Sequence, residues 1–224
     1  MKSRALAKPE FPLQFNLKGR TVLLRPLAAE DREPMIAFAG ELPTDDLLFL
    51  ERDITQPAEV DTWISDTLQR RLVTLVAWEN ETVIGYVTFN LGNVHWTRHV
   101  AELRVVVAES ARGMGIGRLL LELAFEMVLD LGATKVMARM TPEQTGAVKL
   151  FQRLGFAEEA VLRDHALDAN GLTHDLLVLT FHTHMHRQQC CESCGIPVLQ
   201  ALFLDGSWFC LNCYETRYNE LGTG

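Results

Sequence analysis

The sequence predicts an α/β fold with a mixed, mostly antiparallel sheet, one central parallel pair of strands flanked by helices, and a small cysteine-rich tail. The first observation is in residues 100–140, where a buried strand, a glycine-rich turn, a helix and a second strand form one crossover unit. Such a unit is expected to be parallel and right-handed. The second observation is that short apolar segments joined by tight turns lie on both sides of this unit, which favours antiparallel pairing. The third is the position of the five cysteines, all of which follow residue 189.

The composition narrows the class of protein. Its 224 residues suit one medium domain with an appendage, and a hydrophobic content of 48% is ordinary for a globular core. No run of about eighteen apolar residues is present, and the N-terminus lacks the apolar segment of a signal peptide, so we expect no membrane partner. The formal net charge of -8 argues against nucleic-acid binding and is compatible with a cationic, amine-bearing substrate.

The N-terminal half predicts three strands and two helices. Residues 1–19 are interpreted as an N-terminal arm, because proline and glycine interrupt any regular pattern there. The second helix is supported by an apolar face that includes Trp63, and Glu79–Glu81 is typical of a tight hairpin connection. Residues 43–56 form a mixed polar and apolar connection. The elements expected here are strands at 21–27, 72–78 and 82–90 and helices at 28–41 and 57–70.

The C-terminal half predicts the crossover unit and a final hairpin. In the helix after Gly117 the polar residues recur at every fourth position, so they form one narrow stripe on an otherwise apolar cylinder. We therefore expect this helix to be packed on most of its circumference. Gly132 is a suitable residue to end it, and the Asn-Gly pair at 170–171 is typical of a hairpin turn. The other elements expected here are strands at 100–108, 134–140, 156–167 and 173–182 and a helix at 143–154.

The turn Arg112–Gly117 has the chemistry of an anion site. The first amides of a helix have no internal partner, and the helix dipole places partial positive charge there. Glycines remove the side chains that would keep a phosphate away from those amides, and Arg112 and Arg118 can add charge-assisted contacts. A Walker loop is excluded because Arg118 and Leu119 stand where Lys and Ser or Thr are needed. The glycine spacing likewise excludes the dinucleotide-binding fingerprint.

Two sequence blocks together resemble those of a known family. The turn matches R-x-x-G-x-G, and Ala147–Phe156 matches A-x-x-L-Y-x-x-x-G-F except at Phe151. These blocks are similar to the coenzyme A diphosphate loop and the later helix of the GNAT (N-acetyltransferase) superfamily, and residues 24–31 are similar to the start of many of its domains. The likeness covers roughly residues 20–182, so residues 20–185 are identified as a GNAT acetyltransferase domain.

The resemblance implies a GNAT-type fold in which the central parallel strands splay apart and the pantetheine arm of acetyl-CoA enters the gap. Acetyl-CoA is then the cosubstrate, with its diphosphate on the glycine turn. Gln144 stands where the family often has an asparagine that contacts coenzyme A. The cofactor-binding residues that the resemblance implies are Val105, Val107, Arg112, Gly113, Met114, Gly115, Ile116, Gly117, Arg118, Gln144 and Phe151.

Glu102 is the candidate catalytic residue. It lies on the strand before the glycine turn, where the family often has a glutamate that takes the proton of the attacking amine. The alternative is a glutamate paired with Arg104 or another cation. The general acid is also open, because Phe151 replaces the tyrosine that often donates a proton in the family, and Tyr86 fits core packing better. We therefore expect catalysis mainly by positioning and desolvation, with Glu102 assisting.

Residues 186–224 form a separate predicted unit. Cys191-x2-Cys194 and Cys210-x2-Cys213 are separated by fifteen residues, which is the spacing of a zinc ribbon with four cysteine ligands. So small a segment cannot bury enough apolar surface by itself, so a structural zinc ion would supply its folding energy. Cys190 could compete with Cys191, and reduced thiols or a redox pair are the alternative. The remaining chain has no cysteine, which makes a reducing cytoplasm the expected location.

Two functions agree with these patterns. The first is an N-acetyltransferase that moves an acetyl group from acetyl-CoA to a primary amine of a small molecule, peptide or protein lysine, by direct attack in a ternary complex. The glycine turn and Glu102 favour it. The alternative, favoured by Phe151, is a catalytically weak coenzyme A-binding module with the zinc ribbon as a protein-interaction adaptor. The ribbon could recruit a protein substrate, build a homodimer interface or cover the acceptor cleft. Residues 43–56 have no decodable pattern, so the acceptor is not identified.

Overall fold

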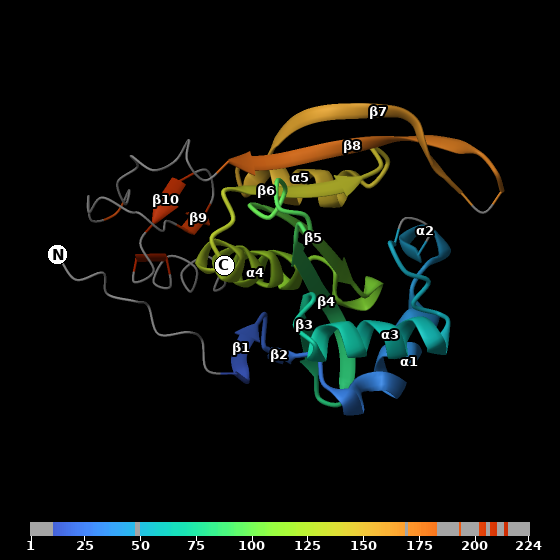
Figure 1. The fold of residues 1–224 in the computed structure, drawn as a ribbon. Coiled ribbons are helices and arrows are strands. Elements are labelled where there is room, and N and C mark those ends of the chain that lie inside the picture. Colours follow the sequence, from blue (N-terminus) through green and yellow to red (C-terminus); the bar gives the residue numbers. More distant parts are fainter. Residues whose placement is uncertain are drawn as a thin grey trace.

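The computed structural model describes residues 11–47, 50–168, 170–182, 193, 202–204, 207–209 and 213–214. Most of them belong to one eight-stranded sheet with the order β1-β2-β3-β4-β5-β6-β8-β7 and its helices (Figure 1). The strands are β1 (Leu13–Leu17), β2 (Arg20–Pro26), β3 (Val73–Glu79), β4 (Thr82–Leu91), β5 (Val100–Val107), β6 (Lys135–Met140), β7 (Ala157–Leu167) and β8 (Thr173–His182). The helices are α1 (Arg32–Glu41), α2 (Thr44–Leu47), α3 (Pro57–Leu68), α4 (Ile116–Asp130) and α5 (Thr145–Arg153), with 3-10 turns η1 (Ala29–Asp31) and η2 (Glu109–Ala111).

Most strands and helices predicted between residues 20 and 182 are confirmed to within a few residues. The N-terminal arm is a correction, because residues 13–17 form the edge strand β1 on β2. Leu13, Phe15 and Leu17 alternate with polar residues, and this period of two suits a strand, but the nearby proline and glycine outweighed it in the sequence pattern. In the tail, the apolar segments 198–203 and 207–209 flank the turn-forming Asp205-Gly206 pair and predict two short strands, and the structure has β9 (Leu202–Leu204) paired antiparallel with β10 (Ser207–Phe209).

The central parallel pair opens after three residues. Val100–Glu102 of β5 pair with Lys135–Met137 of β6, and beyond this point β5 pairs only with β4 while β6 pairs only with β8, among the residues described. The two strands nevertheless continue, to Val107 and Met140 respectively. The sheet is therefore split between β5 and β6, as the sequence resemblance implied.

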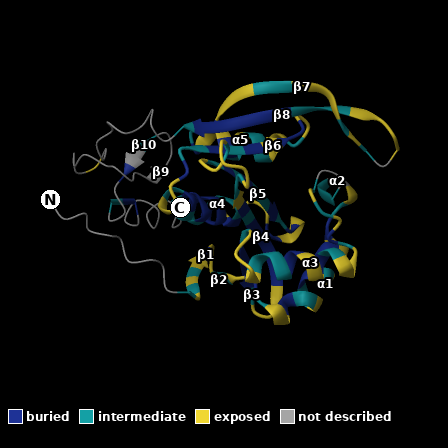
Figure 2. Ribbon diagram, in the orientation of Figure 1, coloured by how far each residue is buried: buried dark blue, intermediate teal, exposed yellow. Residues whose placement is uncertain are grey.

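The helices cover opposite faces of the sheet. The ring of Tyr86 on β4 packs against Phe38 of α1 and Trp63 of α3, with ring centroids 6.0 and 4.7 Å apart. Gly117 of α4 instead lies against Val107 on β5. Tyr86 is paired with Val106, and successive strand residues point to opposite faces, so α1 and α3 lie on one face and α4 on the other. Figure 2 shows that α4 and much of β8 are buried. For α4 this agrees with the prediction of a helix packed on most of its circumference.

The segment 24–31, which resembles the start of GNAT domains, has a structural explanation. Asp31 is 1% exposed and accepts hydrogen bonds from both terminal nitrogens of Arg25, at 2.7 and 2.6 Å, and from the Ala28 amide at 2.8 Å. The Arg25 guanidinium also lies 4.6 Å from the centre of the Trp78 ring. This pair fixes the end of β2 to the start of α1.

The far edge of the sheet is a long hairpin of β7 and β8, in which β7 is mostly exposed (Figure 2). Its Glu159 accepts hydrogen bonds from Lys135 Nζ at 2.6 Å and Thr180 Oγ at 2.7 Å. The hydrogen bond from Lys135, followed by that from Thr180, lowers the pKa of the Glu159 carboxyl below its ordinary value. Among the described helices, none combines the length and the apolar character that a membrane span requires.

Candidate active site

The glycine turn before α4 needs two of its glycines for their backbone conformation. Gly113 has a φ of 73° and Gly115, at the N-terminal cap of α4, has a φ of 92°. Residues with a side chain rarely adopt this left-handed region. A Cβ atom at either position would meet nothing within 4 Å, so backbone conformation, rather than crowding, requires glycine.

The third glycine has a different role. A Cβ atom on Gly117 would lie 3.3 Å from Leu150 Cδ2 and 3.4 Å from Val107 Cγ2, so this glycine lets the start of α4 pack closely on β5 and α5. The first backbone bond at this end of α4 runs from the Leu119 amide to the Gly115 carbonyl at 3.0 Å. Within the described residues, the amides of 113 to 117 donate to no backbone oxygen. They are therefore available to an anion at the positive end of the helix dipole.

Two predicted arginines flank this turn. Arg112 Nε donates to the Val107 carbonyl at 3.4 Å, and its terminal nitrogen pairs with Asp46 of α2. Arg118 Nε donates to Glu122 Oε1 at 2.8 Å, one turn along α4. Arg112 thus joins the turn to α2, and an incoming diphosphate would compete with Asp46 for it.

Arg20 is a further cation at the turn, and the sequence reasoning did not identify it. It belongs to β2, donates to the Met114 sulfur at 2.7 Å and the Ser110 carbonyl at 3.3 Å, and pairs with Glu79. The hydrogen bond to Glu79 raises the pKa of the Arg20 guanidinium above its ordinary value. No local pattern could have indicated this contact, because Arg20 and Met114 are 94 residues apart.

The free edge of β5 carries the predicted pantetheine contacts. The Ala108 amide donates to Ile84 on β4 at 3.0 Å. Backbone groups point alternately to the two neighbours of a strand, so those of Val106 also face β4. The amides and carbonyls of Val105 and Val107 then face the gap between β5 and β6, where the Val107 carbonyl also accepts the hydrogen bond from Arg112 Nε. This arrangement supports the prediction that a bound pantetheine would pair with these two residues.

Gln144 and Phe151 occupy different environments in α5. Gln144 lies at the N-cap position of α5, and its Oε1 accepts a hydrogen bond from the preceding Thr141 amide at 3.0 Å rather than from an amide of the helix. Thr141 follows β6 and is buried, and its hydroxyl has no hydrogen-bond partner among the described residues. Phe151 is 2% exposed, with its ring centroid 5.0 Å from that of Phe156, so its ring belongs to the core. The orphaned hydroxyl, the open amides and the free strand edge together fit a ligand with a diphosphate and an amide-bearing arm.

A pocket opens on the α3 face of the sheet, beside the point where β5 and β6 part. Its volume of about 570 Å³ includes space that is open to solvent. Its floor comes from β4 and β5 and includes the polar residues Thr88, Asn90, Glu102 and Arg104. Glu102 is also the last β5 residue paired with β6. The pocket and the gap therefore meet at Glu102. The apolar wall of this pocket is formed by Leu50, Ile54, Trp63 and Leu72.

Glu102 lies between two guanidinium groups. Its Oε1 accepts a hydrogen bond from Arg139 Nε at 2.8 Å, and Arg139 Nη2 is 2.7 Å away. The terminal nitrogen of Arg104 lies 3.7 Å from the same oxygen. Glu102 is therefore a carboxylate at the pocket, as a proton acceptor would be, and it is also paired with cations, as the alternative interpretation expects.

Tyr86 also lines the pocket but is 2% exposed. Burial raises the pKa of its phenol above the ordinary range, against the opposing effect of Arg104. Its ring contacts Trp63 and Phe38, in agreement with the expected core role. A phenol held so firmly in its neutral form is a hydrogen-bond donor rather than a proton source near neutral pH.

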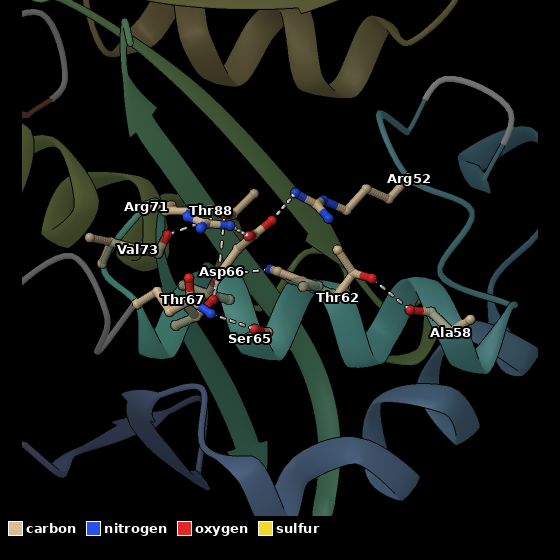
Figure 3. A network of polar contacts seen from close by, with 12 residues as sticks. Arg52, Ala58, Thr62, Ser65, Asp66, Thr67, Arg71, Val73 and Thr88 are labelled. Atoms are coloured by element: carbon tan, nitrogen blue, oxygen red, sulfur yellow. Dashed lines mark hydrogen bonds and ion pairs between the residues drawn. The ribbon is translucent and has the colours of Figure 1, made fainter.

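The wall at residues 50–54 is anchored to α3 by a polar network (Figure 3). Arg52 donates to Asp66 Oδ2 at 2.6 Å, and Arg71 donates to Asp66 Oδ1 at 3.1 Å. Beneath them, Thr88 of β4 donates to the Val73 carbonyl at 3.2 Å. The charge of Arg52 is therefore already paired, and the wall is held in place over the pocket floor.

Three of the four predicted metal ligands, Cys191, Cys194 and Cys210, lie outside the described residues. The fourth, Cys213, is partly buried and packs against the hydrophobic core. No group of three or more possible metal ligands occurs among the residues that the structure describes. Phe209 and Tyr214 are 7% and 8% exposed and belong to the same hydrophobic cluster as the sheet, so described parts of the tail pack on the domain.

Comparisons with known proteins agree with this geometry. The family model described as acetyltransferase (GNAT) family matches residues 36–156, which is more than half of the chain. The putative phosphinothricin acetyltransferase YwnH of Bacillus subtilis (strain 168) is 25% identical over 158 residues, which cover 70% of this chain and 96% of the relative.

Solved structures share the fold of this chain. A ribosomal-protein-alanine N-acetyltransferase from Brucella melitensis has a TM-score of 0.62 and 24% identity, covering 71% of this chain and 99% of its own. YncA of Salmonella typhimurium, a putative acetyltransferase solved with its cofactor acetyl-CoA, has a TM-score of 0.62 and 20% identity, covering 72% and 93%. The chain belongs to the acetyltransferase (GNAT) family and is an acyltransferase.

Proposed function

We propose that this protein transfers the acetyl group of acetyl-CoA to a primary amine by direct attack in a ternary complex. One observation carries the proposal, namely that the gap beside β5 and the pocket on the α3 face meet at Glu102. The free edge of β5 runs five residues from there to Val107, or about 16 Å. An extended arm whose diphosphate lies on the glycine turn would bring its thioester to the pocket along this edge.

The chemical step forms a C–N bond and breaks the C–S bond of the thioester. An alkyl ammonium group must first lose a proton, since its pKa is about 10. Glu102 is the carboxylate placed to accept it, directly or through water, and the amine must then share Glu102 with Arg139. The departing thiolate takes its proton from water, because Phe151 has none to give. Positioning of the two substrates is thus the main contribution.

The relatives do not agree on an acceptor. One is named for phosphinothricin and another for the alanine of a ribosomal protein. The relatives therefore do not identify the acceptor. The three classes expected from the sequence are a small molecule, a peptide and a protein lysine, and they have to be distinguished by which of them this pocket binds.

A thiol-release assay over a panel of amines and peptides tests the proposal, with calorimetry of acetyl-CoA alongside. We expect acetyl-CoA to bind, coenzyme A to compete with it, and Glu102→Gln to lower kcat/KM and change its pH profile. Absence of any binding heat and of competition would refute the proposal. Binding of acetyl-CoA without turnover of any amine would instead support the catalytically weak adaptor.

We also propose that the tail holds a structural zinc ion on Cys191, Cys194, Cys210 and Cys213. The paired Cys-x2-Cys spacing supports this, as does the packing of Phe209 and Tyr214 on the core, since zinc would hold the tail there. The cytoplasm, which keeps thiols reduced, is the proposed location, and a homodimer through the tail stays a prediction.

Metal analysis of purified protein tests the zinc site. We expect one zinc per chain, and we expect Cys210→Ser to lose it. Cys190→Ser is the matched control and should retain it. A metal-free wild-type protein with an unchanged melting temperature in chelator would contradict the proposal.

A further inference from the structure

The side chain of Arg20 connects the glycine turn to a strand that is distant in the sequence. We propose that Arg20 is a positioning residue, which holds the turn in the shape that receives the diphosphate of acetyl-CoA without itself binding a phosphate. This inference rests on the proposed acetyl transfer. It adds a role for β2 and for the end of β3, which lie outside the glycine motif.

The glycine turn depends on support from outside its own backbone. Within the described residues, the amides of 113 to 117 donate to no backbone oxygen, so no bond of this kind keeps them oriented toward an anion. A turn that became ordered only on binding would lose part of its affinity to that ordering. Arg20 Nη1 donates to the Ser110 carbonyl at 3.3 Å and to the Met114 sulfur. One contact lies just before the turn and the other within it, so together they fix the path of the chain into the turn.

Arg20 is itself held at both ends. Its backbone begins β2 directly after the two-residue turn Lys18–Gly19, where both residues have a positive φ, as in the turns that suit a β-hairpin. Its guanidinium donates through Nε and Nη2 to the two carboxylate oxygens of Glu79, at the end of β3. Two parallel bonds of this kind fix the plane of a guanidinium. The remaining nitrogen, Nη1, is therefore directed at the turn before any ligand arrives.

The same contacts argue against direct binding of a phosphate by Arg20. Each of its three side-chain nitrogens already has an acceptor, and Glu79 balances its charge. A phosphate could bind this guanidinium only by displacing two bonds to one carboxylate. Arg112 instead donates to Asp46 through a terminal nitrogen, so it is easier to transfer to a phosphate. The two arginines at the turn therefore have different roles, with Arg112 as the ligand contact and Arg20 as the support.

Arg20→Met removes the donors and tests the support. We expect calorimetry to show a Kd for acetyl-CoA raised about three- to tenfold, which is the usual worth of a hydrogen bond. In the thiol-release assay, KM for acetyl-CoA should rise by the same factor while kcat stays unchanged, because the acceptor pocket lies at the other end of the free edge of β5. Arg32→Met is the matched control, because Arg32 is equally exposed, at 37% against 36%, and pairs with Glu33 and Asp61.

Glu79→Gln separates positioning from direct binding, because the two roles predict opposite signs. If Arg20 positions the turn, loss of the charged anchor loosens its guanidinium, and we expect the Kd for acetyl-CoA to rise about two- to fivefold. If Arg20 binds a phosphate, the substitution frees a cation and removes a negative charge, so the Kd falls. Asp46→Asn gives the comparison, since it frees the ligand contact Arg112 and should tighten binding. Melting curves show whether each variant is folded.

Limited tryptic cleavage after Arg112 in the free protein, identified by mass, adds a measurement that needs no ligand. It should be faster in Arg20→Met than in the wild type or Arg32→Met, and equal rates would overturn the inference. If the wild type binds acetyl-CoA and turns over an amine, but Arg20→Met keeps its Kd or lowers kcat, or Glu79→Gln binds as tightly as wild type or tighter, the inference is overturned and acetyl transfer stands. If the wild type does not bind acetyl-CoA, both are overturned. Weaker binding in both variants with an unchanged kcat supports the inference.

Discussion

Gly115→Ala probes whether the glycine turn is shaped for a ligand. Gly115 has a φ of 92°, and an alanine held there costs about 1–2 kcal/mol. Its Cβ atom would meet nothing within 4 Å, so the backbone conformation is the whole cost. The amides from 113 to 117 have no backbone partner in the described residues, so no backbone bond from these amides holds the turn before a ligand binds, and its other contacts are made by the side chains of Arg20 and Arg112. We expect the free turn to relax and the cost to appear in binding.

The expected result is a Kd for acetyl-CoA raised about 5- to 30-fold, since 1.4 kcal/mol corresponds to a factor of ten. Stability should change little. Isothermal calorimetry measures the first quantity and urea unfolding the second. Thiol-release activity at saturating acetyl-CoA should recover much of the wild-type rate, because the substitution does not touch the acceptor pocket.

Gly132→Ala is the matched control. Gly132 ends α4 with a φ of 88° and also has open space around its Cβ position. Two backbone bonds fix its conformation, from the Gly132 amide to Leu129 at 2.9 Å and from the Ala133 amide to Val128 at 3.2 Å. The same strain should therefore reduce the free energy of unfolding by about 1–2 kcal/mol and leave binding unchanged. If Gly115→Ala instead loses stability and keeps the wild-type Kd, the turn is not shaped for a ligand and the reasoning is refuted.

The remaining predictions concern stability and the cofactor site. Asp31→Ala should lower the free energy of unfolding by about 3 kcal/mol in urea titrations, because its buried pair is broken while the arginine partner keeps 27% exposure. The exposed pair of Asp61 should give no measurable loss in Asp61→Ala, and equal losses would contradict this explanation. Asp46→Asn should tighten acetyl-CoA binding several-fold by calorimetry, because Arg112 no longer has a competing anion, and weaker binding would oppose this role. The lowered pKa of Glu159 means that its stabilising contribution is present above about pH 4.3 and is lost as the pH falls through the lowered value. Glu159→Gln should therefore flatten the acid side of the melting-temperature profile, and an unchanged profile would argue against it.

Local chemistry explains why much of the fold could be predicted. The crossover unit has a buried strand, a glycine turn and an apolar helix in immediate succession. Each of them can be recognised from its own residues, without contacts from distant parts of the chain. Gly113 and Gly115 were recognised as glycines that let an anion approach the helix amides and Gly132 as the residue that ends α4, and all three have a positive φ in the structure. The edge strand β1 was missed because its alternation extends over only five residues next to chain-breaking residues.

The sequence by itself determined the glycine turn, because this turn depends on residues that are neighbours along the chain, and the family resemblance carried by its motifs implied the split parallel pair and Glu102 as a candidate. Only the tertiary structure decided what surrounds them. Arg139 approaches Glu102 because the parallel register sets β6 beside β5, and Arg20 reaches Met114 across 94 residues. Strand periodicity fixes the face on which a side chain lies, but the register between distant strands is fixed by packing of the whole sheet. The ion pairs around Glu102 could therefore be recognised only after the strands were paired.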